Sequence, residues 1–127
     1  MADLPEDLLY NSDHDWVRIE DDTGTCGITD YAQGELGDIV FLELPEVGES
    51  VAQGESYGTV EAVKTVSDLI SPISGEIVEV NTQLTEDASL VNEEPYGEGW
   101  MIRVRLSDPS ESEALMNAAD YAGILDE

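Results

Sequence analysis

The fold class is decided by residues 76–81, EIVEVN, in which acidic and aliphatic residues nearly alternate until the asparagine. A period of two predicts a strand with one face in the core and the other in water. The same alternation returns in residues 100–106, WMIRVRL, and residues 38–44, DIVFLEL, form a third strand that ends at a proline. Short strands separated by Gly, Ser and Asn turns predict antiparallel sheets, packed as a sandwich or a partly closed barrel.

Two helical segments are predicted outside the strands. Residues 108–111, DPSE, place an acceptor at the N-cap, a proline in the first turn and a glutamate three residues after the cap, so a short helix begins there. A second turn through residues 118–121 is expected, with Gly123 as its stop. Residues 29–34 predict another short helix, capped by Thr29.

Several single residues are assigned to the core or to structural roles. Trp16, Phe41 and Trp100 are predicted to be core side chains. Cys26 is the single cysteine, so it makes no internal disulfide and is expected to be a small buried apolar group. His14 is given a structural role beside Trp16, because no nucleophile and carboxylate form a catalytic arrangement around it. We therefore assign no catalytic residue and no metal ligand.

The length of 127 residues fits one domain, 1–127, with its core at about residues 14–106 and a C-terminal helical segment at about 108–124. Thirty acidic residues and four basic ones give a formal net charge of −26. Such a chain repels itself, and molar salt relieves most of that repulsion by shortening the screening length from about 8 Å to about 3 Å. We therefore expect a high-salt cytoplasm.

The same charge excludes several classes of partner. Binding to nucleic acid depends on Lys and Arg that neutralise phosphates, and binding to anionic membranes needs them as well. The first residues, MADLPED, lack the positive start and apolar run of a leader, and no stretch approaches the roughly 18 apolar residues of a membrane span. The sequence therefore predicts a soluble, cytoplasmic protein that binds neither nucleic acid nor membrane.

Lys64 is the only lysine of the chain, and it lies in residues 60–68, VEAVKTVSD, among apolar neighbours. A lysine amine is a nucleophile once deprotonated, so a dedicated ligase could acylate it if it protruded from the fold. One interpretation is an attachment point for a cofactor. The other is a surface residue that survived in a chain that avoids lysine.

The residues around Lys64 resemble the lipoylation segment of glycine cleavage system H proteins, through GTVEAVKTVSD at 58–68 and SPISGEIVEVN at 71–81. Four further stretches match in order, namely HDWV at 14–17, GITDYAQ at 27–33, LGDIVFLELP at 36–45 and PYGEGWM at 95–101. The resemblance spans nearly the whole chain. It implies a mostly β, lipoyl-domain-like barrel-sandwich hybrid of antiparallel strands, with short helices in the N-terminal half and at the C terminus.

The resemblance also implies that Lys64 carries lipoate at the tip of a hairpin. Local preferences do not predict this turn, because residues 63–66, VKTV, lack the Gly or Asn of favoured two-residue hairpins and read as part of one long strand. Packing on either side must therefore enforce the turn.

The function implied by the resemblance is that of a non-catalytic carrier. Lipoyl-Lys64 would receive an aminomethyl group from glycine decarboxylase (P protein), a pyridoxal-phosphate enzyme, and pass it to a folate-dependent aminomethyltransferase (T protein). Dihydrolipoyl dehydrogenase (L protein) would reoxidise the dithiol, and a lipoate-attaching enzyme would load Lys64. The strained dithiolane ring, whose dihedral angle is far from the relaxed value of about 85–100°, makes the disulfide easy to open.

Three acidic residues receive candidate roles from the same resemblance. Asp15 and Asp68 match acidic positions of the cleft that holds the aminomethyl group, although Asp15 replaces the usual glutamate and has one methylene less reach. A carboxylate there would pair with the cationic adduct and shield it from water. Glu61, three residues before the lysine, is assigned to recognition by the ligase or another partner.

Four other functions remain open at this point. A biotin carrier would share the hairpin lysine, but Val63 and Thr65 stand where its flanking methionines would be. A lipoyl domain of a 2-oxoacid dehydrogenase complex would lie in a longer chain. A lipoyl donor or reservoir in lipoate assembly would keep the modification and change its purpose, whereas an acidic interaction module would leave Lys64 unmodified.

Overall fold

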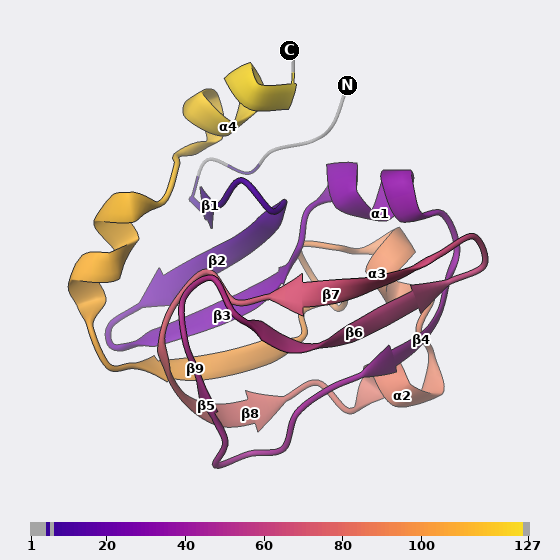
Figure 1. The fold of residues 1–127 in the computed structure, drawn as a ribbon, viewed down its shortest axis with the longest axis horizontal. Coiled ribbons are helices and arrows are strands. Elements are labelled where there is room, and N and C mark those ends of the chain that lie inside the picture. Colours follow the sequence, from indigo (N-terminus) through magenta and orange to yellow (C-terminus); the bar gives the residue numbers. More distant parts are fainter. Residues whose placement is uncertain (1–4, 6, 126–127) are drawn as a thin grey trace.

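The computed structural model describes residues 5 and 7–125 as two antiparallel sheets around a shared core, so the expected mostly β fold is confirmed (Figure 1). The larger sheet has the strand order β1-β2-β3-β9-β8-β5, and the smaller has the order β4-β6-β7. The strands are β1 (Leu9–Tyr10), β2 (Asp15–Glu20), β3 (Thr23–Ile28), β4 (Ile39–Glu43), β5 (Ser50–Val51), β6 (Ser56–Ala62), β7 (Val66–Ile70), β8 (Gly75–Val80) and β9 (Ile102–Leu106). The helices are α1 (Asp30–Leu36), α2 (Gln83–Glu86), α3 (Leu90–Glu93), the 3-10 helix η1 (Pro109–Ala114) and α4 (Ala118–Leu125).

The predicted strands at 76–80, 38–44 and 100–106 correspond to β8, β4 and β9. In β9 the alternation sends Val104 into the core and turns Arg103 and Arg105 to the outside of the larger sheet. There each arginine meets an acidic residue of β8, with Arg103 2.6 Å from Glu79 and Arg105 3.1 Å from Glu76. These exposed pairs contribute at most about 1 kcal/mol each, so burial of the apolar face is what holds the sheet in place.

The main core lies between the two sheets. Its fully buried members come from both sheets and from the short helices α2 and α3, and they include Val17, Leu42, Ile77, Leu84 and Val91. Cys26 belongs to this core with no exposed surface, as predicted. Burial raises the pKa of its thiol far above the ordinary value, which keeps the sulfur neutral.

A second apolar cluster forms on the other face of β2, where α4 covers the N-terminal strands (Figure 1). Trp16 is fully buried there, as predicted, and its indole donates a hydrogen bond of 2.9 Å to the carbonyl of Pro95. The Tyr10 and Tyr121 rings stack with centroids 4.8 Å apart. The hydroxyl of Tyr121 lies 2.7 Å from His14 Nδ1 and 2.9 Å from Thr29 Oγ1. One buried ring therefore joins α4 to β1, to the β1–β2 turn and to the start of α1.

The helix predictions are confirmed in position and corrected in detail. Thr29 caps α1 by accepting a hydrogen bond from the amide of Ala32. Asp108 caps the next segment as expected, but that segment is a 3-10 helix. The stop at Gly123 is wrong, because α4 runs on to Leu125. Leu125 packs against the second cluster, so apolar burial outweighs the tendency of glycine to end a helix.

The core assignment of Phe41 is also wrong, since 51% of this residue is exposed. The reason is a β-bulge in β4, where Ile39 pairs with Ala62 but Phe41 already pairs with Glu61. The extra residue, Val40, reverses the alternation, so Phe41 turns outward and Leu42 turns into the core.

No helix in residues 7–125 is long and apolar enough to cross a membrane. The N-terminal residues on which the leader prediction rests lie mostly outside the described part of the chain.

Replacing Tyr121 with alanine should lower the free energy of unfolding by about 3–5 kcal/mol, because a fully buried aromatic ring leaves a cavity. Tyr121→Phe keeps the ring but loses the bonds to His14 and Thr29, for which about 1–2 kcal/mol is expected. Urea unfolding in molar potassium chloride measures both values. An alanine variant as stable as wild type would show that the second cluster does not support the fold.

Candidate functional site

Lys64 lies at the tip of the β6–β7 hairpin, in a turn formed by residues 63–65. The amide of Ala62 donates a 2.8 Å hydrogen bond to the carbonyl of Thr65, and Glu61 pairs with Val66 just before the turn. Within the described residues, positive φ angles occur at His14, Asp21 and four glycines, none of them in this turn. The hairpin implied by the family resemblance is therefore present, and the long strand read from local preferences is wrong.

The turn is held from outside the hairpin. The amide of Val63 donates a 3.0 Å hydrogen bond to the carbonyl of Asp38, which lies between α1 and β4. Asn92 of α3 fixes both neighbours of Asp38, because its Nδ2 donates to the carbonyl of Gly37 at 2.9 Å and its Oδ1 accepts from the amide of Ile39 at 2.8 Å. These contacts supply the external support that the turn sequence lacks.

The side chain of Lys64 is exposed and crosses the C-terminal end of α1. A Cβ placed on Gly37 would lie 3.7 Å from Lys64 Cε and 3.8 Å from Cδ, so the stem of the lysine passes directly over this glycine. Gly37 has a φ of 84°, a conformation that favours glycine. In the described part of the chain the ion pairs belong to the three arginines and Lys64 takes part in none, which leaves its amine available for acylation.

A continuous polar strip leads away from Gly37 along α1. Glu35 forms a hydrogen bond with Tyr31 that raises the pKa of the phenol, and the Tyr31 ring lies 4.7 Å from the ring of His14. Burial lowers the pKa of His14, while the charges of Asp13 and Glu35 act in the opposite direction. Sequence reasoning missed this strip, although the i, i+4 spacing of Tyr31 and Glu35 could have shown that they share a face of the helix.

His14 has the structural role expected of it, although its partner comes from the far end of the chain. Its hydrogen bond to Tyr121 ties the β1–β2 turn to α4. Its φ of 69° is left-handed, which marks a tight turn at this point.

Asp15 is 2% exposed and lies on the same face of β2 as Val17, facing the main core. Burial raises the pKa of its carboxyl well above the usual range, and a hydrogen bond from Asn11 Nδ2 to Oδ2, 3.3 Å long, partly offsets this. Asn11 also lines a surface cavity of about 400 Å³, with Ser71, Pro72 and Met116 among its walls. The Asp15 carboxyl is thus separated from a hollow in the surface by its own hydrogen-bond partner.

Asp68 and Glu61 lie elsewhere, on the outer face of the smaller sheet. Asp68 pairs with Thr59, and Glu61 lies one cross-strand row nearer to the tip. Both side chains are exposed. The structure therefore brings Lys64, Glu61 and Asp68 together on one hairpin, whereas Asp15 belongs to the other sheet and is buried.

These residues fit a covalently attached acyl chain. Within the described residues the amine on the turn makes no ion pair, and its stem passes beside Gly37. Val63 beside the lysine is 72% exposed, so an apolar chain has an apolar neighbour at its root. The strip along α1 offers donors and carboxylates farther out.

Comparison with known proteins agrees with this geometry. The family model for glycine cleavage H-protein matches residues 8–127. A glycine cleavage system H protein of Rubrobacter xylanophilus is 58% identical over 127 residues, covering 100% of this chain and 98% of the relative, and one from Symbiobacterium thermophilum is 53% identical over 95% of this chain and 94% of the relative. The crystal structure of a glycine cleavage system H protein from Mycobacterium marinum superimposes with a TM-score of 0.90 at 45% identity, covering 98% of this chain and 100% of that one. The chain belongs to the glycine cleavage H-protein family.

Proposed function

We propose that the chain is the lipoyl-bearing shuttle of a glycine cleavage system and has no catalytic activity of its own. The observation that carries this proposal is the amine of Lys64, which makes no ion pair among the described residues, on a three-residue turn at the hairpin tip. When attached there, a lipoyl group supplies a strained disulfide that accepts the aminomethyl group of decarboxylated glycine and is later reoxidised. The partners are glycine decarboxylase (P protein), aminomethyltransferase (T protein), dihydrolipoyl dehydrogenase (L protein) and a lipoate-attaching enzyme.

We infer a path for the arm from the residues near Lys64. Its stem already passes over Gly37, and continuation in that direction leads along the exposed side of α1 toward Tyr31 and His14. Glu35 and Asp13 place negative charge beside this path, which favours an arm that ends in a cation. Asp68 holds an exposed carboxylate on the hairpin itself, where water and salt screen its charge.

Asp15 is the stronger candidate for holding the cationic cargo. A buried carboxyl with a single hydrogen bond from Asn11 costs stability when it ionises, and such groups gather at functional sites. An arriving ammonium group would favour the charged form and gain a charge-assisted hydrogen bond in a dry environment. For this contact Asn11 would have to turn aside, which opens the way from the cavity to the carboxyl.

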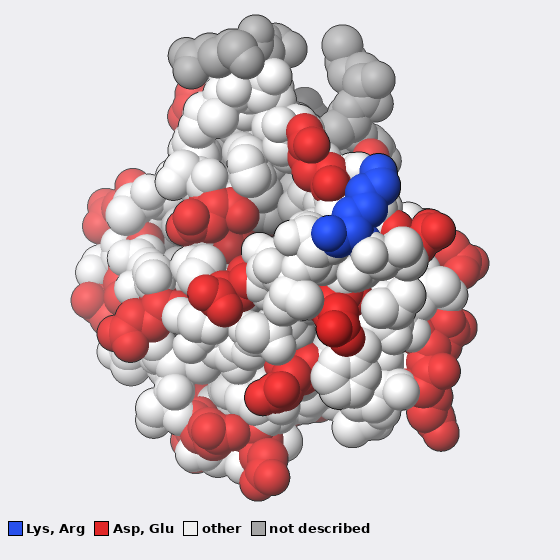
Figure 2. Space-filling model, turned by 45° about the vertical axis from the view of Figure 1, so that its right-hand side comes forward, with Lys and Arg blue, Asp and Glu red and all other residues white. Residues whose placement is uncertain are grey.

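The proposal includes the cellular setting. A net charge of −26 on 127 residues suits a high-salt cytoplasm, because screening replaces the counter-charges that the chain lacks. Acidic side chains are scattered over the whole face seen in Figure 2, with very little basic surface among them.

Lys64→Arg should abolish both lipoylation and carrier activity, because a guanidinium keeps the charge but is not acylated. The measurement is the intact mass after incubation with lipoate, ATP and a lipoate–protein ligase, followed by glycine-dependent exchange of labelled bicarbonate with glycine decarboxylase. Wild type should gain one lipoyl mass on the Lys64 peptide and support exchange, and the variant should do neither.

Two results would contradict the proposal. A biotinyl mass on the Lys64 peptide, or no added mass on wild type with an active ligase, would show that Lys64 is not a lipoylation site. Lipoylated wild type that supports no exchange with an active decarboxylase in matched salt would favour the lipoyl-supply role.

Asp15→Asn should give a protein that is more stable at neutral pH and holds its cargo less well. Because the folded-state pKa of Asp15 is raised above 3.8, wild type loses stability as the pH rises from about 4 through that pKa, and the variant lacks this loss. The aminomethyl-loaded form of the variant should hydrolyse about tenfold faster, since charge-assisted hydrogen bonds contribute about 1.5–3 kcal/mol. Urea unfolding from pH 4 to 8 and the rate of formaldehyde release test both statements, with Glu20→Gln as an exposed control. Equal lifetimes of the aminomethyl-loaded wild type and the loaded Asp15→Asn variant would show that Asp15 does not hold the cargo.

The free energy of unfolding of wild type should rise steeply between 0.1 and 1 M potassium chloride, as the screening length falls from about 10 Å to about 3 Å. Thermal unfolding at fixed pH over this range is the measurement, with sucrose in place of salt as a control for solvent exclusion. A midpoint that is independent of salt would remove the inference of a high-salt setting.

A further inference from the structure

Large apolar side chains are exposed around Lys64. In the part of the chain that the structure describes, five large hydrophobic residues are more than half exposed, and four of them belong to the hairpin turn, its flank or the adjacent strand. These four are Val40 (53%), Phe41 (51%), Val63 (72%) and Val66 (59%), and the fifth, Val47, lies in the loop after β4. We refer to Val40, Phe41, Val63 and Val66 as the hairpin patch.

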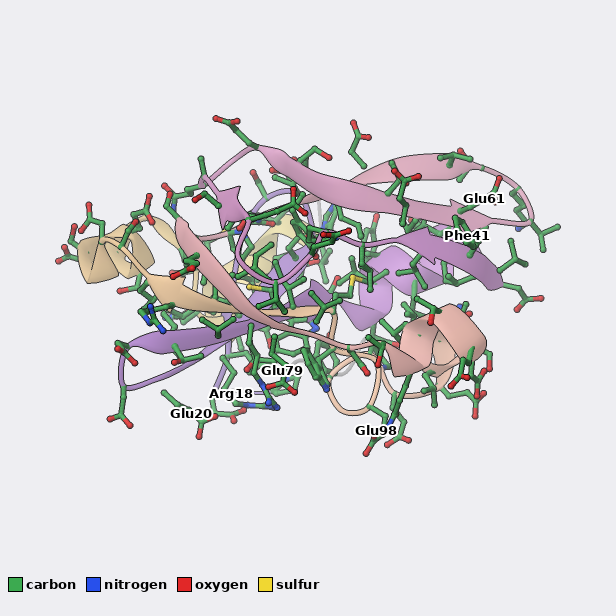
Figure 3. All side chains as sticks on the ribbon, turned by 90° about the horizontal axis from the view of Figure 1, so that it is seen from below. Arg18, Glu20, Phe41, Glu61, Glu79 and Glu98 are labelled. Carbon is green, nitrogen blue, oxygen red and sulfur yellow. The ribbon has the colours of Figure 1, made fainter. Side chains whose placement is uncertain are left out.

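Strand register places two members of the patch in one row, with Glu61 between them. Phe41 pairs with Glu61, and Glu61 pairs with Val66, so the three side chains form one row across β4, β6 and β7. Neighbouring strands lie about 4.8 Å apart, which puts Phe41 and Val66 within about 10 Å of each other. Val63 and Lys64 follow immediately at the turn. Figure 3 shows Phe41 and Glu61 next to the end of this hairpin.

The β-bulge at Val40 is what exposes the aromatic member. Regular alternation from the buried Ile39 would send Phe41 into the core, and the extra residue turns it outward instead. Bulges are local devices that re-aim side chains. An exposed aromatic side chain, grouped with three exposed valines beside Lys64, is a feature typical of a binding surface.

Carboxylates border the patch. Glu61 lies inside the row, and the next row inward consists of Glu43, Thr59 and Asp68. Glu43 and Asp68 are exposed, like Glu61. An occupant therefore needs an apolar pocket with basic residues at its rim, and a second copy of this strongly acidic chain does not meet that requirement.

The chemistry of acylation at Lys64 indicates which enzyme must contact the hairpin patch. In the loading step the neutral Nζ amine attacks the carbonyl carbon of an activated lipoyl group and an amide bond forms. The activating group leaves with the electron pair of the broken bond, and the nitrogen gives up one proton to the solvent. The lysine side chain spans about 6 Å at bond lengths of about 1.5 Å, and reacting atoms must approach to about 3–3.5 Å. The loading enzyme must therefore cover the turn and its flanks, whereas enzymes that act on the far end of the arm need not.

We propose that the hairpin patch, together with Glu61, is the docking surface for the lipoate-attaching enzyme, which receives it in an apolar pocket rimmed by Arg or Lys. This rests on the proposed function, because it presumes that Lys64 is the lipoylated residue. Phe41 is the central anchor, and Glu61 steers the approach and fixes the register.

The test is the rate at which a lipoate–protein ligase, with lipoate and ATP, adds mass to the Lys64 peptide. Phe41→Ser should lower kcat/KM at least about fivefold through a higher KM, the loss expected when a side chain that contributes to an interface is truncated. Val47→Ser, an equally exposed apolar residue outside the patch, should leave the rate unchanged, and Phe41→Tyr should retain it. Glu61→Gln should also slow loading, and this effect should shrink from 0.1 to 1 M potassium chloride while that of Phe41→Ser persists.

Glu20→Gln on the opposite side of the molecule is the matched charge control (Figure 3). Unfolding midpoints equal to wild type confirm that the exposed substitutions preserve the fold. Loading of Phe41→Ser at the wild-type rate would overturn the proposal, as would equal losses for Val47→Ser. A wild-type chain that is dimeric in gel filtration and becomes monomeric as Phe41→Ser would also overturn it. Wild type that gains no lipoyl mass would instead remove the proposed function itself.

Discussion

The hydrogen bond from the amide of Val63 to the carbonyl of Asp38 is the contact on which the presentation of Lys64 depends. It joins a turn with no conformational preference of its own to the junction of α1 and β4. That junction is in turn fixed by the carboxamide of Asn92, which satisfies Gly37 on one side and Ile39 on the other. A lysine that is to carry an acyl group, as proposed for Lys64, needs freedom at its amine and rigidity at its Cα. The backbone beside Lys64 is anchored, and among the described residues its amine makes no ion pair.

The larger sheet supports the fold, and the smaller sheet presents the hairpin. The six-stranded sheet, covered on one side by α4, forms the support, because it carries the second cluster and the pairing of the chain ends through Tyr10 and Met116. The three-stranded sheet closes the core with one face and presents the hairpin patch with the other. Asp15 belongs to the supporting sheet, and its carboxyl faces the core that the two sheets share, near the β1–β2 turn.

The sequence predicts the parts of this structure that local chemistry determines. Alternation in β9 and near-alternation in β8, which has a register shift between Ile77 and Glu79, indicate the larger sheet. Thr29 and Asp108 cap the segments that follow them, and Cys26 is buried as its type suggests. The turn at Lys64 is different, because its determinants lie in α3 and at the start of β4, about 25 residues away on either side in sequence. Only the family resemblance located it.

The core assignment of Phe41 and the helix stop at Gly123 are wrong for a related reason. A bulge is a property of two strands in register, so the sequence of β4 alone reads as regular alternation and buries Phe41. The sequence around Gly123 predicts the end of a helix, and only the apolar contacts of α4 explain why the helix continues to Leu125. Asp15 was recognised as a site candidate, but its burial depends on packing that no local pattern contains.

The distribution of the arginines has a consequence for encounters in solution. All three lie on the larger sheet, where Arg103 and Arg105 are matched by neighbouring glutamates, and Figure 3 places Arg18 on the side opposite to Phe41 and Glu61. Apart from Lys64, the basic side chains of the described residues are therefore confined to the larger sheet. A cationic enzyme surface that approaches the smaller sheet meets exposed carboxylates such as Glu43, Glu61 and Asp68 and no arginine, which favours encounters on the side of the hairpin.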